Sequence, residues 1–223
     1  MKITAENYFI IGLLFVCFTS FKQLNIIKPN SSKTLVKTTN LLSKDSTGYI
    51  NGIFLPAKIN NSKKTFNIRY NVYKDEMEIK ENDAIYFLPK NIGQTIYFQS
   101  TNKVFQVYSV INKAENKKTY FILLFGGAKL TLLLKERIDL HSRFISNKRY
   151  IGYLPPTFKH IKGKLYVGYK NNTSQELPKK KKDILKLFSY KSKEVELFAN
   201  NNNYGFKKQK DLIELFKFYD SLK

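Results

Sequence analysis

Apolar and polar residues alternate with a period of two through the middle of the chain, between residues 65 and 134. In the first run, Phe66, Ile68, Tyr70 and Val72 occupy every second position. This alternation is typical of a β-strand with one buried and one wetter face, because a helix would place its apolar residues three or four positions apart. The pattern therefore predicts an antiparallel sheet.

Turn-forming residues divide this region into short strands. Lys74-Asp75 interrupts the first run, and Glu81-Asn82-Asp83 follows the second, since Asn and Asp side chains bond their own backbone. A strand at Gly48–Leu55, ended by Pro56, is expected before them. The other expected strands lie at residues 76–80, 84–88, 95–99, 104–111, 120–125 and 130–134, and a last hairpin joins 158–161 to 165–169 around Lys162-Gly163.

Gly126-Gly127 marks the clearest hairpin, because two glycines supply the positive φ angles of a two-residue turn. A two-residue loop here would place Leu123 opposite Leu130 and Phe121 opposite Leu132. The run at 120–125 is apolar on both faces, so we expect it at the centre of the sheet. Residues 138–150 either extend the strand that begins at Leu130 or form an irregular crossing.

Helical spacing replaces the two-residue alternation after Asn171 and predicts three short helices. Pro178 stands near the start of the first helix, Ser192 is placed to cap the second, and Asp211 with Glu214 resembles a capping box for the third. Short helices are marginal alone, so they should pack on the sheet or on each other. Their apolar stripes are Ile184, Leu187 and Phe188, then Val195 and Phe198, then Leu212, Leu215, Phe216 and Tyr219.

These elements predict an α+β chain that is mainly β. The expected fold is an antiparallel β-meander, curled into a sandwich or a partly open barrel and followed by a small C-terminal cluster of short helices. The expected segments are a signal peptide at 1–20, a polar leader at 21–47, a β domain at 48–170 and a helical segment at 171–223.

The N-terminus has the pattern of a secretory signal peptide. Lys2 precedes an apolar stretch at residues 8–18 that is too short to cross a bilayer comfortably, and Thr19-Ser20 is the best cleavage position. An uncleaved anchor and lipidation at Cys17 are the alternatives. Cys17 is the only cysteine, so a cleaved chain would have neither a disulfide nor a thiolate metal site.

The formal net charge of +22 does not by itself indicate a nucleic-acid-binding protein. Only four of the 39 basic residues are arginine, which leaves 35 lysines. Arginine makes the bidentate contacts to phosphate and guanine, so no specific nucleic acid is expected as a partner. Either the lysines are solvated residues that follow from AT-rich codons, or they attract the chain weakly to an anionic surface such as a bacterial envelope.

A group of acidic residues invites a catalytic or calcium-binding interpretation. The alternation places Glu76, Glu78 and Lys80 on the solvent face, which instead indicates a strand edge blunted by charge. An envelope hydrolase would use Asp75 with Glu78 or Asp83. The acidic group comprises Asp75, Glu76, Glu78, Glu81 and Asp83.

The most compact basic feature is the run Lys179, Lys180, Lys181 and Lys182. Cations at a helix N-terminus oppose the helix dipole, so the run suggests either a bound anion or a frayed, solvated helix start.

Arg69 and Asn71 form a second candidate, because the alternation turns them to the face opposite Tyr70. A polar ladder there would serve either sheet cohesion or ligand contact, and cohesion is the favoured role.

Other catalytic and metal-binding patterns are missing from the sequence. His141 and His160 lie far apart without metal-ligand spacing, and there is no nucleophile-elbow, phosphate-loop or His-Glu helix motif. We therefore expect no catalytic residue, no metal and no cofactor.

The order of features resembles a loose group of uncharacterised exported bacterial cell-envelope proteins. The likeness rests on the leader, on the Gly126-Gly127 hairpin, on the helical tail near Phe218-Tyr219, and on the segments at 48–54 and 68–78. It implies an envelope location and no particular activity. The expected function is a non-catalytic binding or structural module, exported to the periplasm or cell surface, whose partner is an anionic polymer, a lipid head group or an envelope protein. A carboxylate hydrolase and a lysine-driven nucleic-acid binder are the alternatives.

Overall fold

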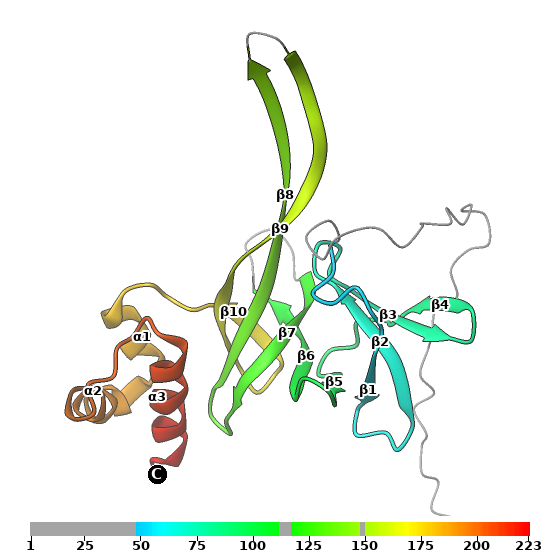
Figure 1. The fold of residues 1–223 in the computed structure, drawn as a ribbon. Helices are drawn as coiled ribbons and strands as arrows, with labels where there is room; N and C mark the ends of the chain where they lie inside the picture. The colour runs from blue at the N-terminus through cyan, green and yellow to red at the C-terminus, as the bar shows by residue number, and fades with distance from the viewer. Residues whose placement is uncertain (1–47, 112–116, 148–149) are drawn as a thin grey trace, which may run out of the picture.

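The computed structural model describes residues 48–111, 117–147 and 150–223, with the side chains of 142–155 left out. The predicted signal peptide, the polar leader and Cys17 lie outside these residues. The described chain is mainly β, with helices at its C-terminal end, which confirms the predicted class (Figure 1). The strands are β1 (Leu55–Ile59), β2 (Thr65–Asn71), β3 (Glu76–Glu81), β4 (Ala84–Phe87), β5 (Thr95–Phe98), β6 (Lys103–Val110), β7 (Lys117–Gly126), β8 (Thr131–Asn147), β9 (Tyr150–Gly168) and β10 (Thr173–Glu176).

The ten strands form one sheet in the order β10-β9-β8-β7-β6-β5-β1-β2-β3-β4. β10 also pairs with β6, so the strands from β6 to β10 close into a five-stranded ring, the barrel half of the molecule. The closing pair is parallel, because strands that alternate in direction around an odd-numbered ring must leave one parallel pair. β10 lies beyond residue 170, so the sheet extends into the segment that the sequence assigned to helices.

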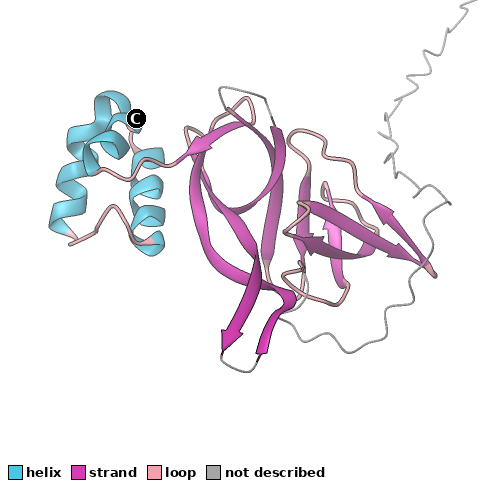
Figure 2. Ribbon diagram, turned by 90° about the horizontal axis from the view of Figure 1, so that it is seen from above, coloured by secondary structure: helices cyan, strands magenta, loops and turns pink. Residues whose placement is uncertain are grey.

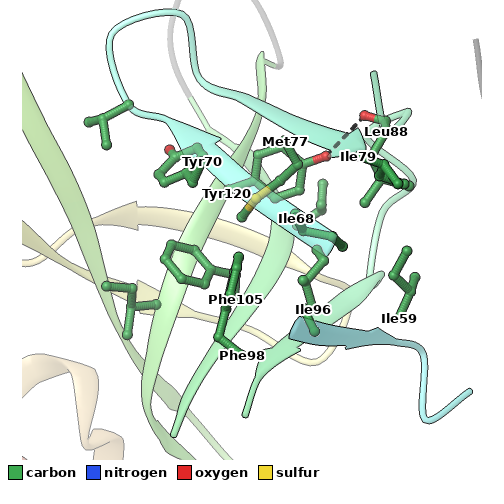
Figure 3. Close-up of a cluster of buried hydrophobic side chains, with 14 of the residues drawn as sticks. Ile59, Ile68, Tyr70, Met77, Ile79, Leu88, Ile96, Phe98, Phe105 and Tyr120 are labelled. Atoms are coloured by element: carbon green, nitrogen blue, oxygen red, sulfur yellow. Dashed lines mark hydrogen bonds between the residues drawn. The ribbon is translucent and has the colours of Figure 1, made fainter. Parts of the chain in front are cut away.

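The strands from β1 to β5 form the second part of the sheet, the curled half. They curl beside the barrel half (Figure 2). The main core lies between the two halves, where Ile68, Tyr70 and Met77 meet Phe105 and Tyr120 (Figure 3). Tyr70 stacks edge-on against the rings of Phe105 and Tyr120, with centroids 5.2 and 5.8 Å away. The alternation that predicted an inward Tyr70 is confirmed.

Two smaller apolar clusters complete the packing. Tyr108, Phe121 and Leu133 form one of them on three adjacent strands of the barrel half. The other lies under the helices and includes Leu132 and Val167 of the sheet. Because neighbouring positions on β7 and β8 serve different clusters, these strands are apolar on both faces, as expected for the run at 120–125.

The C-terminal helices pack beside the barrel half as a small cluster (Figure 1). They are α1 (Lys181–Leu187), the 3-10 turn η2 (Ser189–Lys191), α2 (Ser192–Asn201) and α3 (Gln209–Ser221). In the described residues, no helix has both the length and the apolar surface to cross a membrane.

The loop between β7 and β8 fastens α3 to the sheet. The Lys129 backbone N–H donates to Asp220 Oδ1 over 2.8 Å, and Lys129 Nζ donates to the carbonyl oxygens of Tyr219 and Leu222. These carbonyls lie at a helix end, where intrahelical partners are missing and a cation is favourable.

The predicted Gly126-Gly127 hairpin has the wrong register. Gly126 pairs with Thr131 and Leu123 with Leu133, so the loop spans residues 127–130. A Cβ on Gly127 would lie 2.5 Å from the Leu130 carbonyl oxygen and 2.8 Å from Asp220 Oδ1. The glycine is therefore needed for close approach to α3, rather than for a two-residue turn.

The predicted hairpin around Lys162-Gly163 is also wrong, because both of its arms belong to β9. β8 and β9 form long antiparallel partners, so the alternative in which residues 138–150 extend β8 is confirmed. The register shifts near Gly163, whose Cβ would lie 2.8 Å from the Lys135 carbonyl oxygen. The Lys-Gly signal thus marks a bulge and a close backbone approach, which a turn pattern resembles locally.

Three local predictions also need correction. β1 begins at Leu55 and includes Pro56, while residues 48–54 contribute only an isolated bridge from Tyr49 to Asn71. Ser192 is the first residue of α2 and makes no cap bond, since Lys191 is the N-cap. Asp211 accepts the Gly205 N–H, rather than capping its own helix.

We predict that Gly127→Ala lowers the free energy of unfolding by about 1–3 kcal/mol, because the added methyl group overpacks a site closed by backbone. Urea unfolding would measure the loss. The neighbouring Gly126→Ala is the matched control, since its Cβ would make only ordinary contact with Leu123 at 3.5 Å. Equal effects at the two glycines would contradict the close approach seen at Gly127.

Candidate functional site

A buried carboxylate, Asp75, lies where the turn between β2 and β3 meets the barrel half. The backbone of Asp75 lies in the left-handed region at φ 58°, which Asp tolerates better than most residues. Asp75 is 6% exposed. A charge so far from water needs partners, and Asp75 obtains them from both halves of the sheet.

Hydroxyl groups and lysines hold the two oxygens of Asp75. Tyr70 donates to Oδ1 over 2.6 Å, and Thr119 of β7 donates to Oδ2 over 2.7 Å. Lys90 Nζ lies 2.7 Å from Oδ2, and Lys135 Nζ of β8 pairs with Oδ1. These five residues form the Asp75 network, which is fully hydrogen-bonded at the carboxylate.

Lys135 is the barrel-side centre of the Asp75 network. Besides Asp75, its Nζ approaches the Tyr70 hydroxyl at 2.9 Å, Thr119 Oγ1 at 2.5 Å and the Tyr120 carbonyl oxygen at 3.2 Å. An ammonium group offers three protons, so the number of acceptors around it is more than sufficient. The side chain is 18% exposed, which leaves the ion pair largely shielded from solvent.

The environment shifts the pKa values of this network in different directions. Burial opposes ionisation of Asp75, but Lys135, Lys90 and Tyr70 together outweigh it and lower the pKa of the carboxyl group. Burial lowers the pKa of Lys135, and the charge of Asp75 limits that fall. For this pair, the lowered pKa of Asp75 is the dominant effect, because several hydrogen-bond donors converge on its one carboxylate. Burial also raises the pKa of Tyr70, so its phenol stays protonated and donates.

The predicted solvent-exposed acidic edge is wrong for two of its members. Glu78 is 5% exposed, and β3 lies inside the sheet, because β4 is the edge strand. Asp75 accepts a hydrogen bond from Tyr70, whereas Glu78 forms an ion pair with Arg69. Tyr70 and Arg69 are neighbours on β2 and face opposite sides of the sheet. Asp83 is exposed in the turn before β4. The pairs proposed for a hydrolase, Asp75 with Glu78 or Asp83, therefore have separate surroundings.

Arg69 performs the cohesive role that the sequence favoured. It lies directly across the ladder from Glu78, and its Nε donates to Glu78 Oε2 over 2.7 Å. The guanidinium lies over the rings of Tyr49 and Phe54, 4.2 and 4.4 Å from their centroids. Arg69 also reaches the Gly52 carbonyl oxygen at 3.4 Å, so one side chain holds the loop at residues 48–54 against β2.

Asn71 supports the neighbouring turn and is only 5% exposed. Its Oδ1 accepts the Lys74 N–H over 3.0 Å. Asn71 therefore helps to hold the turn that carries Asp75.

The predicted lysine run divides between different surfaces. Lys179 lines hollows next to the sheet, while Lys182 lines a separate hollow with Lys186. Lys181 pairs with Glu196 at 2.7 Å, and Lys180 is the exposed N-cap of α1. α1 has only seven residues, so the predicted anion site at its N-terminus lacks a helix of useful length.

A different set of lysines gathers beside Lys179. Two hollows, of about 500 and 440 Å³, share Lys179, Phe206 and Lys207 in their walls. We call their combined surface the lysine groove. Its lysines come from β9, from residues 179–181 at the start of α1 and from the loop before α3: Lys162, Lys164, Lys179, Lys181, Lys207 and Lys208.

The lysine groove carries an excess of positive charge. Its two carboxylates are already engaged, since Glu176 pairs with Lys164 at 2.8 Å and Asp211 accepts the Gly205 N–H. Phe206 is half-buried between the hollows and offers an apolar ring among the cations. The arrangement can attract an extended anion that also has apolar surface.

His141 and His160 are exposed on the β8 and β9 partners. Within the described ranges, no three His, Cys, Asp or Glu residues come together in a way that could hold a metal ion.

Comparisons of the chain with protein-family models, curated proteins and solved structures found no match. Its candidate sites therefore have to be interpreted from their own geometry.

Sequence reasoning missed the partners of Asp75 and most of the lysine groove. Lys90 and Thr119 carry no local mark, and Thr119 and Lys135 meet Asp75 only where the two halves come together. Lys162, Lys164 and Lys207 were indistinguishable from the many other lysines. The one available signal was Lys135, a charged residue that continues the apolar run of β8.

We predict that Asp75→Asn lowers the free energy of unfolding by about 3–5 kcal/mol at pH 7, because it leaves two lysines without their buried counter-charge. Asn tolerates the left-handed backbone, so the change isolates the charge. Asp83→Asn is the matched control at an exposed position, with an expected effect within about 0.5 kcal/mol.

A comparison of wild type with Asp75→Asn also tests how the stability depends on pH. The pKa of Asp75 is lower in the folded chain than the value of about 3.9 expected after unfolding. The carboxylate therefore stabilises the fold fully above that value, and the contribution is lost as the pH falls through the folded pKa. Urea unfolding should show a constant gap between wild type and Asp75→Asn above about pH 5 and a shrinking gap below about pH 4. A gap that widens in acid would contradict this assignment.

Proposed function

We propose that the protein is a non-catalytic binding module that holds an anionic polymer along the lysine groove. The observation that carries the proposal is the convergence of lysines from three separate segments on two adjoining hollows. Lysine is a flexible point charge, so a row of lysines suits a polymer with repeated charges better than one group that requires bidentate contacts.

The exposed part of the Phe206 ring favours a polymer that contains rings as well as negative charges. Its ring lies between the hollows, with Lys181 Nζ 5.4 Å from the centroid. A sugar ring can pack on such a face while its acidic groups meet the lysines. An anionic polysaccharide of a cell surface therefore fits better than a simple polyphosphate. This choice accords with the export and envelope location that the leader suggests, which are part of the same proposal.

We predict that Lys162→Gln, Lys179→Gln and Lys207→Gln together weaken binding of the full chain to alginate, a uronic-acid polysaccharide, by about tenfold or more, equivalent to about 1.4 kcal/mol. Calorimetric titration at about 0.15 M salt would measure the change, and binding should weaken further as salt rises. Neutral dextran should not bind.

A second triple variant separates the groove from net charge. Lys63→Gln, Lys80→Gln and Lys118→Gln remove the same charge from exposed positions in the two halves of the sheet. This variant should bind alginate within about twofold of wild type. Equal losses in the two triple variants would show that the groove has no special role. Tighter binding to single-stranded DNA than to alginate, with sequence preference, would instead favour a nucleic-acid partner.

A further inference from the structure

A small cavity lies beneath the loop at residues 48–54, where the curled half of the sheet meets β6. Its volume is about 110 Å³. Ile68, Phe98 and Phe105 form apolar parts of its wall, and these residues belong to the main core (Figure 3). The rings of Phe98 and Phe105 meet edge-on at 5.5 Å, which gives the wall a fixed shape.

The loop wall of the cavity is held in place by Arg69. The guanidinium binds the Gly52 carbonyl oxygen and packs on Phe54, so the adjoining Ile53 stays at the cavity although its own side chain is 67% exposed. The charge of Arg69 is already paired, because its Nε lies 2.7 Å from Glu78 Oε2. Arg69 therefore positions the wall and is not the group that would receive a ligand's charge.

Lys103 supplies the available charge at the rim. It lines the cavity together with Thr101 and is 43% exposed. Its ion pair with Glu136 is 3.8 Å long, which is beyond hydrogen-bond distance. A carboxylate placed at the rim could take a shorter, charge-assisted bond from Lys103.

The volume sets the size of the apolar part of a ligand. An apolar protein cavity of about 150 Å³ accommodates benzene. A cavity somewhat smaller than that accommodates a branched chain of about four carbons, with the polar end left at the opening.

We propose that this cavity binds a short branched-chain carboxylate, with the hydrocarbon against Phe98 and Phe105 and the carboxylate at Lys103. The site is separate from the lysine groove, because the two share no lining residue. The inference does not depend on polymer binding.

The test is a titration of the full chain with 3-methylbutanoate, followed by methyl NMR. Resonances of Ile53, Leu55 and Ile68 should shift and saturate. Lys103→Gln should weaken 3-methylbutanoate about tenfold, while the neutral 3-methylbutanol should bind wild type and variant equally. Lys80→Gln is the matched control for loss of one exposed lysine and should leave both affinities unchanged.

A chain-length series tests whether the cavity is enclosed. Affinity should rise about fourfold for each carbon added to a short acid and then stop rising beyond about six carbons. Leu55→Phe, which adds volume to the wall, should abolish binding while near-UV circular dichroism stays native. Absence of saturable shifts in folded wild type, equal loss from Lys103→Gln and Lys80→Gln, or affinity that keeps rising through octanoate would each overturn the proposal.

Discussion

The ion pair between Asp75 and Lys135 is the contact on which the two-part fold depends. Asp75 belongs to a turn of the curled half, and Lys135 belongs to β8 of the barrel half. Apolar surfaces can slide over one another, but a shielded ion pair has a narrow geometry and a large cost when one partner is lost. The pair therefore adds a directional contact between two halves that are also joined by the β5–β6 ladder and by the hydrophobic core.

Each half then presents its own kind of surface. The curled half uses Arg69 to hold a loop over an apolar cavity, and the barrel half, with its helices, collects lysines in an open groove. Arg69 near the core is paired with Glu78 and packed between aromatic rings, whereas the groove holds more lysines than carboxylates. The difference follows from burial, because a lysine or arginine close to the core needs a partner, whereas an exposed lysine does not.

Sequence periodicity predicted the strands well because it depends on neighbours two positions away. Tyr70 was placed in the core on that basis alone. The burial of Asp75 could not be predicted in this way, since its partner Lys135 lies 60 residues further along the chain. For the glycines, the local sequence suggested turns that the structure does not have. Gly127 and Gly163 have the local pattern of turns, but their roles are set by Asp220 and by the β8 backbone, which approach from distant segments.

The closure of the barrel half by β10 against β6 has a consequence for how the chain reaches its final state. Ser109 of β6 pairs in parallel with Thr173 of β10, and three further strands of the ring lie between them in the sequence. Long-range parallel pairing is slow, because the entropy of a large loop is lost before any contact rewards it. During synthesis, the ring therefore stays open until residues 173–176 have emerged, so β10 is the strand that closes it.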